Sequence, residues 1–476
     1  MVSDNSRFDA VIIGGGPGGV TAATQLAGLG LTTALVENRL IGGECHYWAC
    51  NPTKTLLRPI EVLELAKEVP GVRELLRGDR VDTAAALAKR DTIIDHLSDD
   101  GLVDALTQAG IDVLHGHGRL NGERAVTITD VEGRTQRVQA RHAVVLATGT
   151  RPLLPDIAGL AAASPWTNRE LATMTRVPPR TIVLGGGVVG VECATILSGL
   201  GSDVTMLVRG TTLLRGSEPF AGERVARALR DRGVTIHFRA APTSVARCAA
   251  GGAVTVTRGD DILEADEIVI ATGRLANTDD LGMATVGLDG GEFVAVDDHL
   301  TSTGVEGHWL YAIGDTTGRA LLSHVSQYHA GIVANVVKAR ADGTALDGPQ
   351  FVARDNGTLP QVIFTDPNVI EVGRTESDAR AAGFTVTTRT VDYPGMPGEL
   401  LIQRDGFDAA AKLVVDADRD VLLGATFVGP GVADLVHAAT VAVVGQVPLS
   451  VLRHAVAPHP SLSQMWNALL AAPADA

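Results

Sequence analysis

An α/β fold is predicted for this chain, because one pattern of strand, glycine-rich turn, helix and strand occurs in it twice. The first copy covers residues 8–37 and the second covers residues 181–208. Glycine accounts for 54 of the 476 residues, a larger share than the average of about 7% in proteins. The glycines show no G-x-y period. They therefore serve in turns and close backbone approaches. The length and the 45% of hydrophobic residues allow about three domains with separate cores.

The first copy opens with an apolar, β-branched strand at residues 8–13. Gly14, Gly16 and Gly19 follow in the order G-x-G-x-x-G, an apolar helix is expected at residues 20–29, and a second strand ends at Glu37. Such a turn brings the backbone close to a pyrophosphate at a helix N-terminus, and a carboxylate about 20 residues on binds ribose hydroxyls. The unit is therefore Rossmann-like, and it predicts a site for an adenine dinucleotide with an unmodified ribose.

The second copy repeats the turn but changes the end of the second strand. Strands are expected at residues 181–184 and 203–208, with a helix at residues 191–200; the turn glycines are Gly185, Gly187 and Gly190. In place of a carboxylate, Val208 is followed by Arg209, and Arg215 lies six residues on. Arginine binds phosphate through two donors, whereas a carboxylate would repel a 2′-phosphate. NADPH is therefore expected here rather than NADH, unless the two arginines are only a solvated face.

Further glycines punctuate the ends of later strands. Ala-Thr-Gly occurs with Gly149 and again with Gly273, and a third apolar strand ends in Gly314 and Asp315. The carboxylate of Asp315 can accept a hydrogen bond from a polyol chain, or it can cap the helix that follows.

Two of the four cysteines lie five positions apart, at Cys45 and Cys50, and Lys54, one of five lysines, follows. Residues five apart on a regular helix have Cα atoms about 8.6 Å apart, too far for a disulfide. A disulfide therefore needs a distorted chain, and we expect Asn51 and Pro52 to supply a turn that runs into a helix. Cys50 would then lie near a helix N-terminus, where the helix dipole lowers the pKa of a thiol.

This spacing predicts a redox-active pair, with two alternatives. The cysteines could be ordinary buried packing. They could also bind a metal together with His46, but no second Cys/His pair stands at zinc-site spacing, so no metal site is predicted.

Composition limits the partners. A net charge of −15 argues against nucleic acid and against an anionic membrane surface. No secretory signal and no apolar run long enough for a membrane span are found. Four cysteines without a disulfide framework are typical of a cytoplasmic protein.

Taken in order, these motifs resemble those of the flavoprotein disulfide reductases, the family of glutathione reductase, dihydrolipoamide dehydrogenase and mercuric reductase, over essentially the whole chain. Residues 360–373 resemble the opening of the family's C-terminal interface domain, and residues 459–461 its terminal His-Pro-Thr. The resemblance implies an FAD domain at residues 1–155 and 280–349, an NAD(P)H domain at 156–279, and an α+β dimerisation domain at 350–476.

The resemblance also implies a role for each matching residue. Cys50 would be the thiolate against the flavin, Cys45 the thiol that exchanges with substrate, and Asp315 the group that binds the ribityl chain. An ion pair would lie beside the flavin N5, and an acid/base histidine would come from the partner subunit of a homodimer. These last residues are Lys54 and Glu192 for the ion pair and His459 for the acid/base; Arg274 matches the arginine of the Ala-Thr-Gly-Arg nucleotide motif.

Three positions depart from the family. Gln464 replaces the glutamate that usually holds the terminal histidine, so it can orient His459 by a hydrogen bond but adds no charge. The large rings of residues 46–48 stand between the cysteines, either as core packing or as the lining of a pocket for a flat substrate, and His46 is also a candidate acid/base. Thr24 and Gln25 stand where glutathione reductases carry arginine, which argues against glutathione.

The expected reaction passes hydride from NADPH through FAD to the disulfide of Cys45 and Cys50, and on to a small disulfide substrate, or it oxidises a dithiol in reverse. Two alternatives stay open. One is an NAD(P)H-dependent flavoprotein that reduces a quinone, a metal or oxygen, and the other is a non-catalytic flavin-binding subunit.

Overall fold

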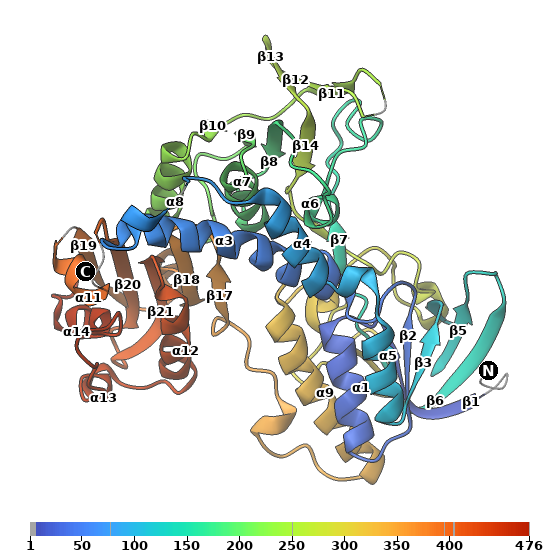
Figure 1. Ribbon diagram of the computed structural model, residues 1–476. Helices are drawn as coiled ribbons and strands as arrows, with labels where there is room; N and C mark the ends of the chain where they lie inside the picture. The colour runs from blue at the N-terminus through green and yellow to red at the C-terminus, as the bar shows by residue number, and fades with distance from the viewer. Residues whose placement is uncertain (1–5, 77, 250, 395, 403–404, 476) are drawn as a thin grey trace. The chain divides into compact units, whose positions relative to one another are not determined.

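The computed structural model describes residues 6–76, 78–249, 251–394, 396–402 and 405–475. The chain forms two compact units. Figure 1 shows their helices and strands. Unit 1 combines Met1–Pro52, Asp91–Leu153 and Gly273–Asp355, and unit 2 combines Thr53–Arg90, Leu154–Thr272 and Asn356–Ala476. The three predicted domains stay a prediction, and their outer bounds, residues 1 and 476, lie outside the described residues.

Unit 1 is built on a seven-stranded sheet with the order β3-β2-β1-β6-β5-β4, in which β16 also pairs with β6. Strands β3, β2, β1, β6 and β16 are mutually parallel. The first part of β6 also pairs antiparallel with β5, and β5 pairs antiparallel with β4. The bounds are β1 Ser6–Ile13, β2 Thr33–Glu37, β3 Ile111–His115, β4 His117–Leu120, β5 Ala125–Thr129, β6 Thr135–Leu146 and β16 Leu310–Ala312. The carboxyl ends of β1, β2, β6 and β16 meet at one edge of this sheet, where the predicted glycine motifs follow them.

Helices α1 and α9 lie side by side against this sheet (Figure 1). Alternate residues of β1 face opposite ways, so Ala10 and Ile12 pack on these helices while Val11 and Ile13 pack in a second core on the other face. Unit 1 contains α1 Pro17–Gly28, α2 Gly43–Tyr47, α5 Asp100–Gln108 and α9 Ser323–Asp342, the 3₁₀ turns η2 Asp95–Leu97, η3 Met283–Val286, η4 Gly314–Thr317 and η5 Pro349–Phe351, and a ribbon of β7 Thr150–Pro152 with β15 Arg274–Ala276. Helices α3 Cys50–Glu68 and α4 Thr83–Ile93 each have residues in both units.

Unit 2 repeats the strand-turn-helix pattern on a four-stranded parallel sheet with the order β10-β9-β8-β14. Its strands are β8 Arg180–Leu184, β9 Asp203–Val208, β10 Thr235–Phe238 and β14 Glu267–Ile270, with helices α6 Asn168–Ala172, α7 Val188–Gly199 and α8 Pro219–Asp231. An antiparallel sheet of β11 Ser244–Arg247, β12 Val254–Arg258 and β13 Asp261–Ala265 accompanies it. Helix α7 is buried over residues 190–197, which agrees with its mostly apolar sequence.

The rest of unit 2 is an antiparallel sheet with the order β17-β18-β21-β20-β19. Its elements are β17 Pro360–Ile363, β18 Asn368–Gly373, β19 Val386–Pro394, β20 Asp408–Asp416 and β21 Val421–Gly429, the helices α10 Glu376–Ala381, α11 Met396–Ile402, α12 Val436–Val444, α13 Leu449–Leu452 and α14 Gln464–Ala471, and the turns η1 Arg73–Leu75 and η6 Val432–Leu435. A core of apolar residues from this sheet, α12 and α14 supports the segment that carries His459. None of the described helices is long and apolar enough to cross a membrane.

Candidate active site

The three glycines of the first turn have three different tasks. Gly14 has a φ of +109°, and a Cβ atom there would lie 2.3 Å from the carbonyl oxygen of Ala147. A Cβ atom on Gly19 would lie 1.8 Å from the carbonyl oxygen of Gly14, so helix α1 can approach the strand only without a side chain. A Cβ atom on Gly16 would meet nothing within 4 Å. The first and third glycines therefore close the turn, and the middle one leaves an open cradle.

The second turn has the same geometry. Gly185 has a φ of +127° and stands against the carbonyl oxygen of Ala271, which a Cβ atom would approach to 2.1 Å. A Cβ atom on Gly190 would lie 2.4 Å from the carbonyl oxygen of Gly185, and one on Gly187 would meet nothing. Each turn runs into the first turn of a twelve-residue helix, which is α1 after the first turn and α7 after the second. The backbone N–H groups at the N-terminus of such a helix have no acceptor within the helix.

Polar groups of unit 1 surround the first cradle. Glu37 uses one oxygen to accept the Gly15 N–H at 2.7 Å and the other to accept the Arg39 N–H at 2.7 Å. A carboxylate has about four acceptor sites, so it retains capacity for hydroxyl groups. Burial raises the pKa of Glu37, against the lowering effect of these hydrogen bonds. The hydroxyl of Thr148 is buried and has no hydrogen-bond partner within the described chain. An open cradle, an acceptor and an unsatisfied hydroxyl fit an adenine dinucleotide.

The residues after β9 differ from those after β2, as predicted. Arg209 and Arg215 are both exposed, and neither makes an ion pair with any described residue. Two guanidinium groups are thus presented to solvent in the segment where the first unit has a carboxylate. Gly149 and Gly273 follow β6 and β14 with φ values of +66° and +138°.

The segment that holds the cysteines is two helices separated by a break. Helix α2 ends at Tyr47, Trp48 leaves helical geometry at φ −133° and ψ 1°, and α3 begins at Cys50. The prediction that Asn51 and Pro52 make the turn was wrong, because both lie in the first turn of α3. A proline is tolerated there, since the first N–H groups of a helix have no intrahelical acceptor. The prediction that Cys50 lies at a helix N-terminus is confirmed.

Cys45 and Cys50 are both half-buried. The sulfur of Cys50 lies 3.3 Å from the hydroxyl of Ser323, the first residue of α9. A hydroxyl at this distance can donate a hydrogen bond to a thiolate. No signal in the sequence connects these two residues, which are 273 positions apart.

The rings between the cysteines have separate environments. Tyr47 is fully buried, and its hydroxyl donates to the carbonyl oxygens of Ile41 and Ser98. It is therefore core packing, one of the two predicted readings. Trp48 and His46 are half-buried and pack in a row with Tyr47.

The ring of His46 has a defined tautomer. The side-chain amide nitrogen of Asn51 can only donate, so Nδ1 of His46 accepts at 3.2 Å and the ring proton is on Nε2. Burial lowers the pKa of His46, although the charge of Asp95 opposes the shift. The shift favours the neutral form of the ring.

The ion pair of Lys54 and Glu192 is present in unit 2. Nζ of Lys54 lies 2.6 Å from Oε2 of Glu192, and the same ammonium group stands over the ring of Phe364 at 5.1 Å. Oε1 of Glu192 accepts the N–H of Phe364 at 3.0 Å. The carboxylate side chain is 8% exposed, whereas the lysine side chain is 32% exposed. Helices α3 and α7 and the end of β17 are joined by these contacts.

His459 and Gln464 also make the predicted contact. Nδ1 of the exposed imidazole lies 2.8 Å from Oε1 of Gln464, which can only accept, so Nδ1 carries a proton. In the neutral ring Nε2 is then unprotonated and faces away from this bond. The amide orients the ring but contributes no charge.

Asp315 is at one end of a polar network in unit 1 that sequence reasoning did not find. Its Oδ2 accepts from the Thr150 hydroxyl at 2.7 Å, and this hydroxyl accepts from Nε of Arg274 at 2.6 Å. Arg274 also forms an ion pair with Glu44, the residue before Cys45. Burial raises the pKa of Asp315. The presence of a carboxylate next to a redox cysteine was the only available signal.

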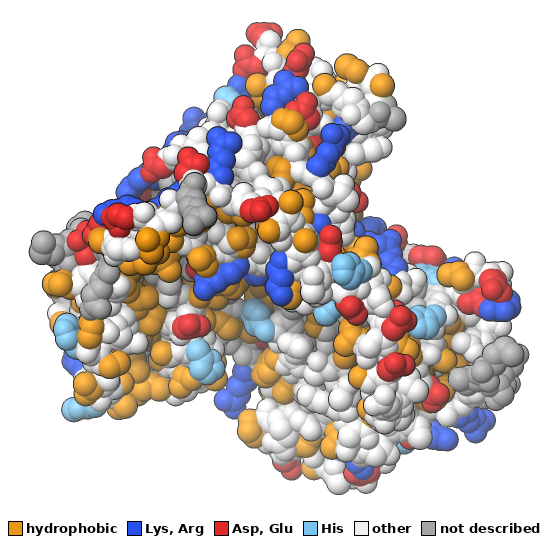
Figure 2. Space-filling view, viewed as in Figure 1, with side chains coloured by type: hydrophobic (Ala, Val, Ile, Leu, Met, Phe, Trp, Pro, Cys, Tyr) orange, Lys and Arg blue, Asp and Glu red, His pale blue; other side chains and the backbone are white. Residues whose placement is uncertain are grey.

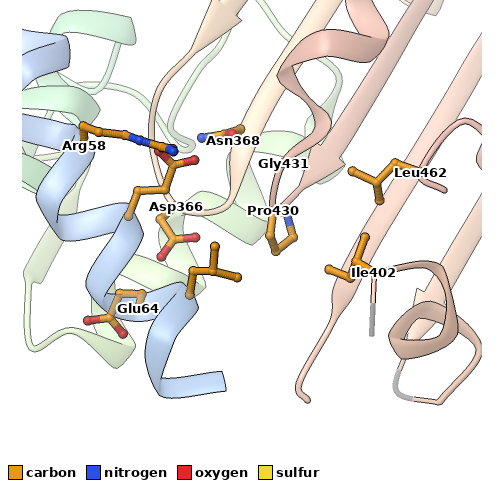
Figure 3. A pocket seen from close by; sticks show the side chains of 10 residues that line it. Arg58, Glu64, Asp366, Asn368, Ile402, Pro430, Gly431 and Leu462 are labelled. Carbon is orange, nitrogen blue, oxygen red and sulfur yellow. The ribbon is translucent and has the colours of Figure 1, made fainter. Parts of the chain in front are cut away.

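Unit 2 also has a pocket of about 230 Å³ between α3 and the loops of the C-terminal sheet (Figure 3). It contains none of the predicted site residues, and its lining is Arg58, Glu61, Glu64, Leu65, Asp366, Asn368, Ile402, Pro430, Gly431 and Leu462. Its carboxylates are paired with Arg58, Lys67 and Arg232. We assign it no role.

Comparison with known proteins identifies the family. Residues 8–343 match the pyridine nucleotide-disulphide oxidoreductases, and residues 359–469 match the dimerisation domain of the same family. The chain belongs to this family. A dihydrolipoyl dehydrogenase from Chlorobaculum tepidum is 31% identical, covering 96% of this chain and 95% of that protein. A mercuric reductase from Streptomyces lividans is 30% identical, covering 98% and 96%.

A solved structure is similar in fold. The copper(II) complex of the HOCl-induced flavoprotein disulfide reductase RclA from Escherichia coli superposes with a TM-score of 0.82 at 24% identity, covering 98% of this chain and 99% of that one. The α/β fold class is thereby confirmed. Members of the pyridine nucleotide-disulphide oxidoreductases are FAD-dependent enzymes that act on sulfur groups, so the family implies FAD and a pyridine nucleotide as cofactors.

Substitutions in the first turn are expected to separate folding from cofactor binding. Gly16→Ala adds a methyl group in open space, so the chain should fold normally but lose at least about tenfold in FAD affinity, because the methyl group fills the cradle. Gly19→Ala places the methyl group against the backbone of Gly14 and should lower the melting temperature as well. FAD content and thermal unfolding of the apoprotein measure the two effects. Normal FAD binding by Gly16→Ala would contradict this placement of the cofactor.

Proposed function

We propose that this enzyme is an NADPH-dependent FAD disulfide oxidoreductase that reduces a small disulfide through Cys45 and Cys50, or oxidises a dithiol in reverse. One observation carries the proposal. Cys50 is the first residue of the 19-residue helix α3, and Cys45 precedes it across a break in the helix. A helix N-terminus stabilises a thiolate, and the break removes the regular helical geometry that would hold the two sulfur atoms apart.

When bound, FAD supplies the two-electron relay between the nicotinamide and the cysteine pair. The protein residues then carry out the exchange. The Cys45 thiolate attacks one sulfur of the substrate, whose S–S bond breaks as a mixed disulfide forms and the first thiol leaves. The Cys50 sulfur next attacks Cys45, which releases the second thiol and forms the Cys45–Cys50 disulfide. Each leaving thiolate takes one proton, so one substrate disulfide takes up two electrons and two protons.

We assign the proton donor to His459. Its Nδ1–H is held by Gln464, which leaves Nε2 to carry the exchanged proton. We assign Lys54 and Glu192 to the place where hydride arrives, and Asp315 to the ribityl chain. Ser323 supports the Cys50 thiolate by its hydroxyl.

His459 is exposed on the surface of its own chain, which agrees with a homodimer in which it acts at the site of the partner subunit. Figure 2 shows hydrophobic side chains gathered over the C-terminal helices of unit 2. The exposed apolar residues of the segment 436–456 include Val441, Val444, Val451 and Val456, the last of which is 87% exposed. Such a set is typical of an interface, and it lies in the segment that matches the dimerisation domain. We assign the enzyme to the cytoplasm, because a pool of nicotinamide nucleotides is available there.

NADPH is assigned from the two arginines. We expect Arg209→Asp to reduce kcat/KM for NADPH by about 10- to 100-fold, since an arginine–phosphate contact is charge-assisted and a carboxylate repels the 2′-phosphate. The value for NADH should stay within about twofold. Steady-state kinetics with both nucleotides measures this. Arg176→Gln, at an exposed arginine before β8, is the matched control. An equal loss for the two nucleotides would contradict the assignment.

One experiment tests the function as a whole. FAD-loaded protein is oxidised and then titrated anaerobically with NADPH, and thiols are counted before and after with an aromatic disulfide reagent. Two new thiols per chain, together with a long-wavelength absorption band, are expected. A reduced flavin with no new thiols would instead favour the second candidate, reduction of a quinone, a metal ion or oxygen. The neutral amide that holds His459 motivates this alternative.

A further inference from the structure

A continuous chain of contacts in unit 1 connects the helix of the exchanging cysteine to the carboxylate of the flavin site. It begins at Glu44 in α2, passes to Arg274 at the start of β15, then to Thr150 at the start of β7, and ends at Asp315 in η4. Four segments far apart in the sequence contribute one residue each. None of these contacts is explained by the reaction steps above.

Arg274 is the branching point of this chain. One terminal nitrogen of its guanidinium donates both to Glu44 and to the carbonyl oxygen of Thr150, at 2.9 Å for the latter. Its Nε donates to the Thr150 hydroxyl, whose own proton is donated to Asp315. The rigid, planar guanidinium group can satisfy these directions together, which an ammonium group cannot do.

The charges of Glu44, Arg274 and Asp315 depend on one another, so a change in one residue affects the other two. Two carboxylates share one cation, because Nε of Arg274 also lies 4.0 Å from Oδ2 of Asp315. Burial raises the pKa of Asp315; Thr150 and Arg274 oppose this shift, and the charge of Glu44 adds to it. The side chains of Arg274 and Glu44 are 19% and 17% exposed, so solvent screens them only in part. Removing the charge of Glu44 therefore changes the electrostatic environment of Asp315, and removing the charge of Asp315 changes that of Glu44.

We propose that Glu44, Arg274 and Thr150 are positioning residues that couple the helix of Cys45 to the flavin-site carboxylate Asp315. This inference rests on the proposed function, because it takes Cys45 as the exchanging thiol and Asp315 as the ribityl ligand. Glu44 precedes Cys45 within the five-residue helix α2, so fixing its carboxylate fixes the start of the redox segment. Flavin retention and the reactivity of Cys45 are then two readouts of one link.

Two measurements test the link, and neither depends on turnover. The first is the rate at which FAD is released from the holoprotein, followed by fluorescence. The second is the rate at which iodoacetamide alkylates Cys45 in the reduced protein, followed by peptide mass spectrometry. Glu44→Gln, Arg274→Lys and Thr150→Val each break the link while nearly keeping side-chain size. Each should change both rates by at least about fivefold, the lower end of typical coupling between sites.

The conservative and double variants separate coupling from simple destabilisation. Thr150→Ser restores the hydroxyl and should return both rates to wild-type values. Because the link can be broken only once, Glu44→Gln should have no further effect on FAD release in the Thr150→Val protein. Arg151→Gln is the matched control: Arg151 follows Thr150 in β7, and its contacts with Asp279, Asn277 and the carbonyl oxygen of Ala276 include no member of the link, so both rates should stay unchanged.

Three results would overturn the link. They are rates within twofold of wild type for Glu44→Gln or Thr150→Val, additive effects in the double variant, and an equal response to Arg151→Gln. The proposed function is judged separately, by NADPH-driven disulfide reduction in the wild-type protein. A wild-type protein without that activity, but with variants that respond as described, would refute the function and leave the link standing.

Discussion

Cys50→Ser is expected to lower NADPH-driven reduction of a small disulfide by at least about 10³-fold, because a serine hydroxyl does not form or exchange disulfides at neutral pH. The long-wavelength absorption band after NADPH addition should also disappear. Cys45→Ser should abolish turnover to the same degree but keep the band, because Cys50 is still present at the N-terminus of α3. Disulfide-dependent NADPH oxidation and anaerobic spectra measure the two effects.

Two controls make this result specific to the pair. Cys248→Ser, at the exposed cysteine of unit 2, should leave turnover unchanged. Reduction of a one-electron or quinone acceptor should survive in all three variants, because it does not need the cysteines. If Cys50→Ser retains more than a tenth of the disulfide activity, the exchange mechanism is refuted.

Lys54→Met is expected to have the largest effect on stability. It leaves the carboxylate of Glu192, which is 8% exposed, without its cation, and breaking a buried ion pair from one side costs about 3 kcal/mol. For a domain of about 250 residues, that corresponds to a fall in melting temperature of roughly 6 °C. Differential scanning calorimetry of the apoprotein measures it. Reduction of FAD by NADPH, followed by stopped flow in the holoprotein, should also become slower.

The chain contains a matched control on the same helix. Lys67 is 33% exposed, much like Lys54, but its partner Glu64 is 33% exposed as well. Lys67→Met should therefore cost under about 1 kcal/mol, as exposed pairs do. The double variant Lys54→Met with Glu192→Gln should recover most of the lost stability, because the amide still accepts the Phe364 N–H. Equal losses for the two lysines would mean that burial of Glu192 is not the cause.

Much of the fold could be predicted from short segments of the sequence. The strand at residues 203–208 and the strand end at Glu37 were predicted to the residue, and the two glycine turns have the geometry expected of them. The ion pair of Lys54 and the contact of His459 with Gln464 were also expected, from the resemblance to a family. These features depend on residues close in sequence or on motifs whose spacing is specific.

Local propensity failed at the redox segment. Asn51 and Pro52 favour a turn by themselves, yet both lie inside α3, and the chain bends at Trp48 instead. Tyr47 explains the difference, because its buried ring and the bonds of its hydroxyl to Ile41 and Ser98 fix the end of α2 within unit 1. Packing of one large ring thus outweighed the turn preference of two residues.

The sequence by itself determined the class of fold, the two dinucleotide turns and the chemistry of the cysteine pair, because each is encoded within about 40 consecutive residues. Only the tertiary structure decided where the helix breaks between the cysteines, which hydroxyl stands beside Cys50, and that Glu44, Arg274, Thr150 and Asp315 form one chain of contacts. These contacts join residues up to 273 positions apart. No periodicity or spacing records such pairs, since they arise when helices, turns and a short ribbon that are distant in the sequence pack together in unit 1.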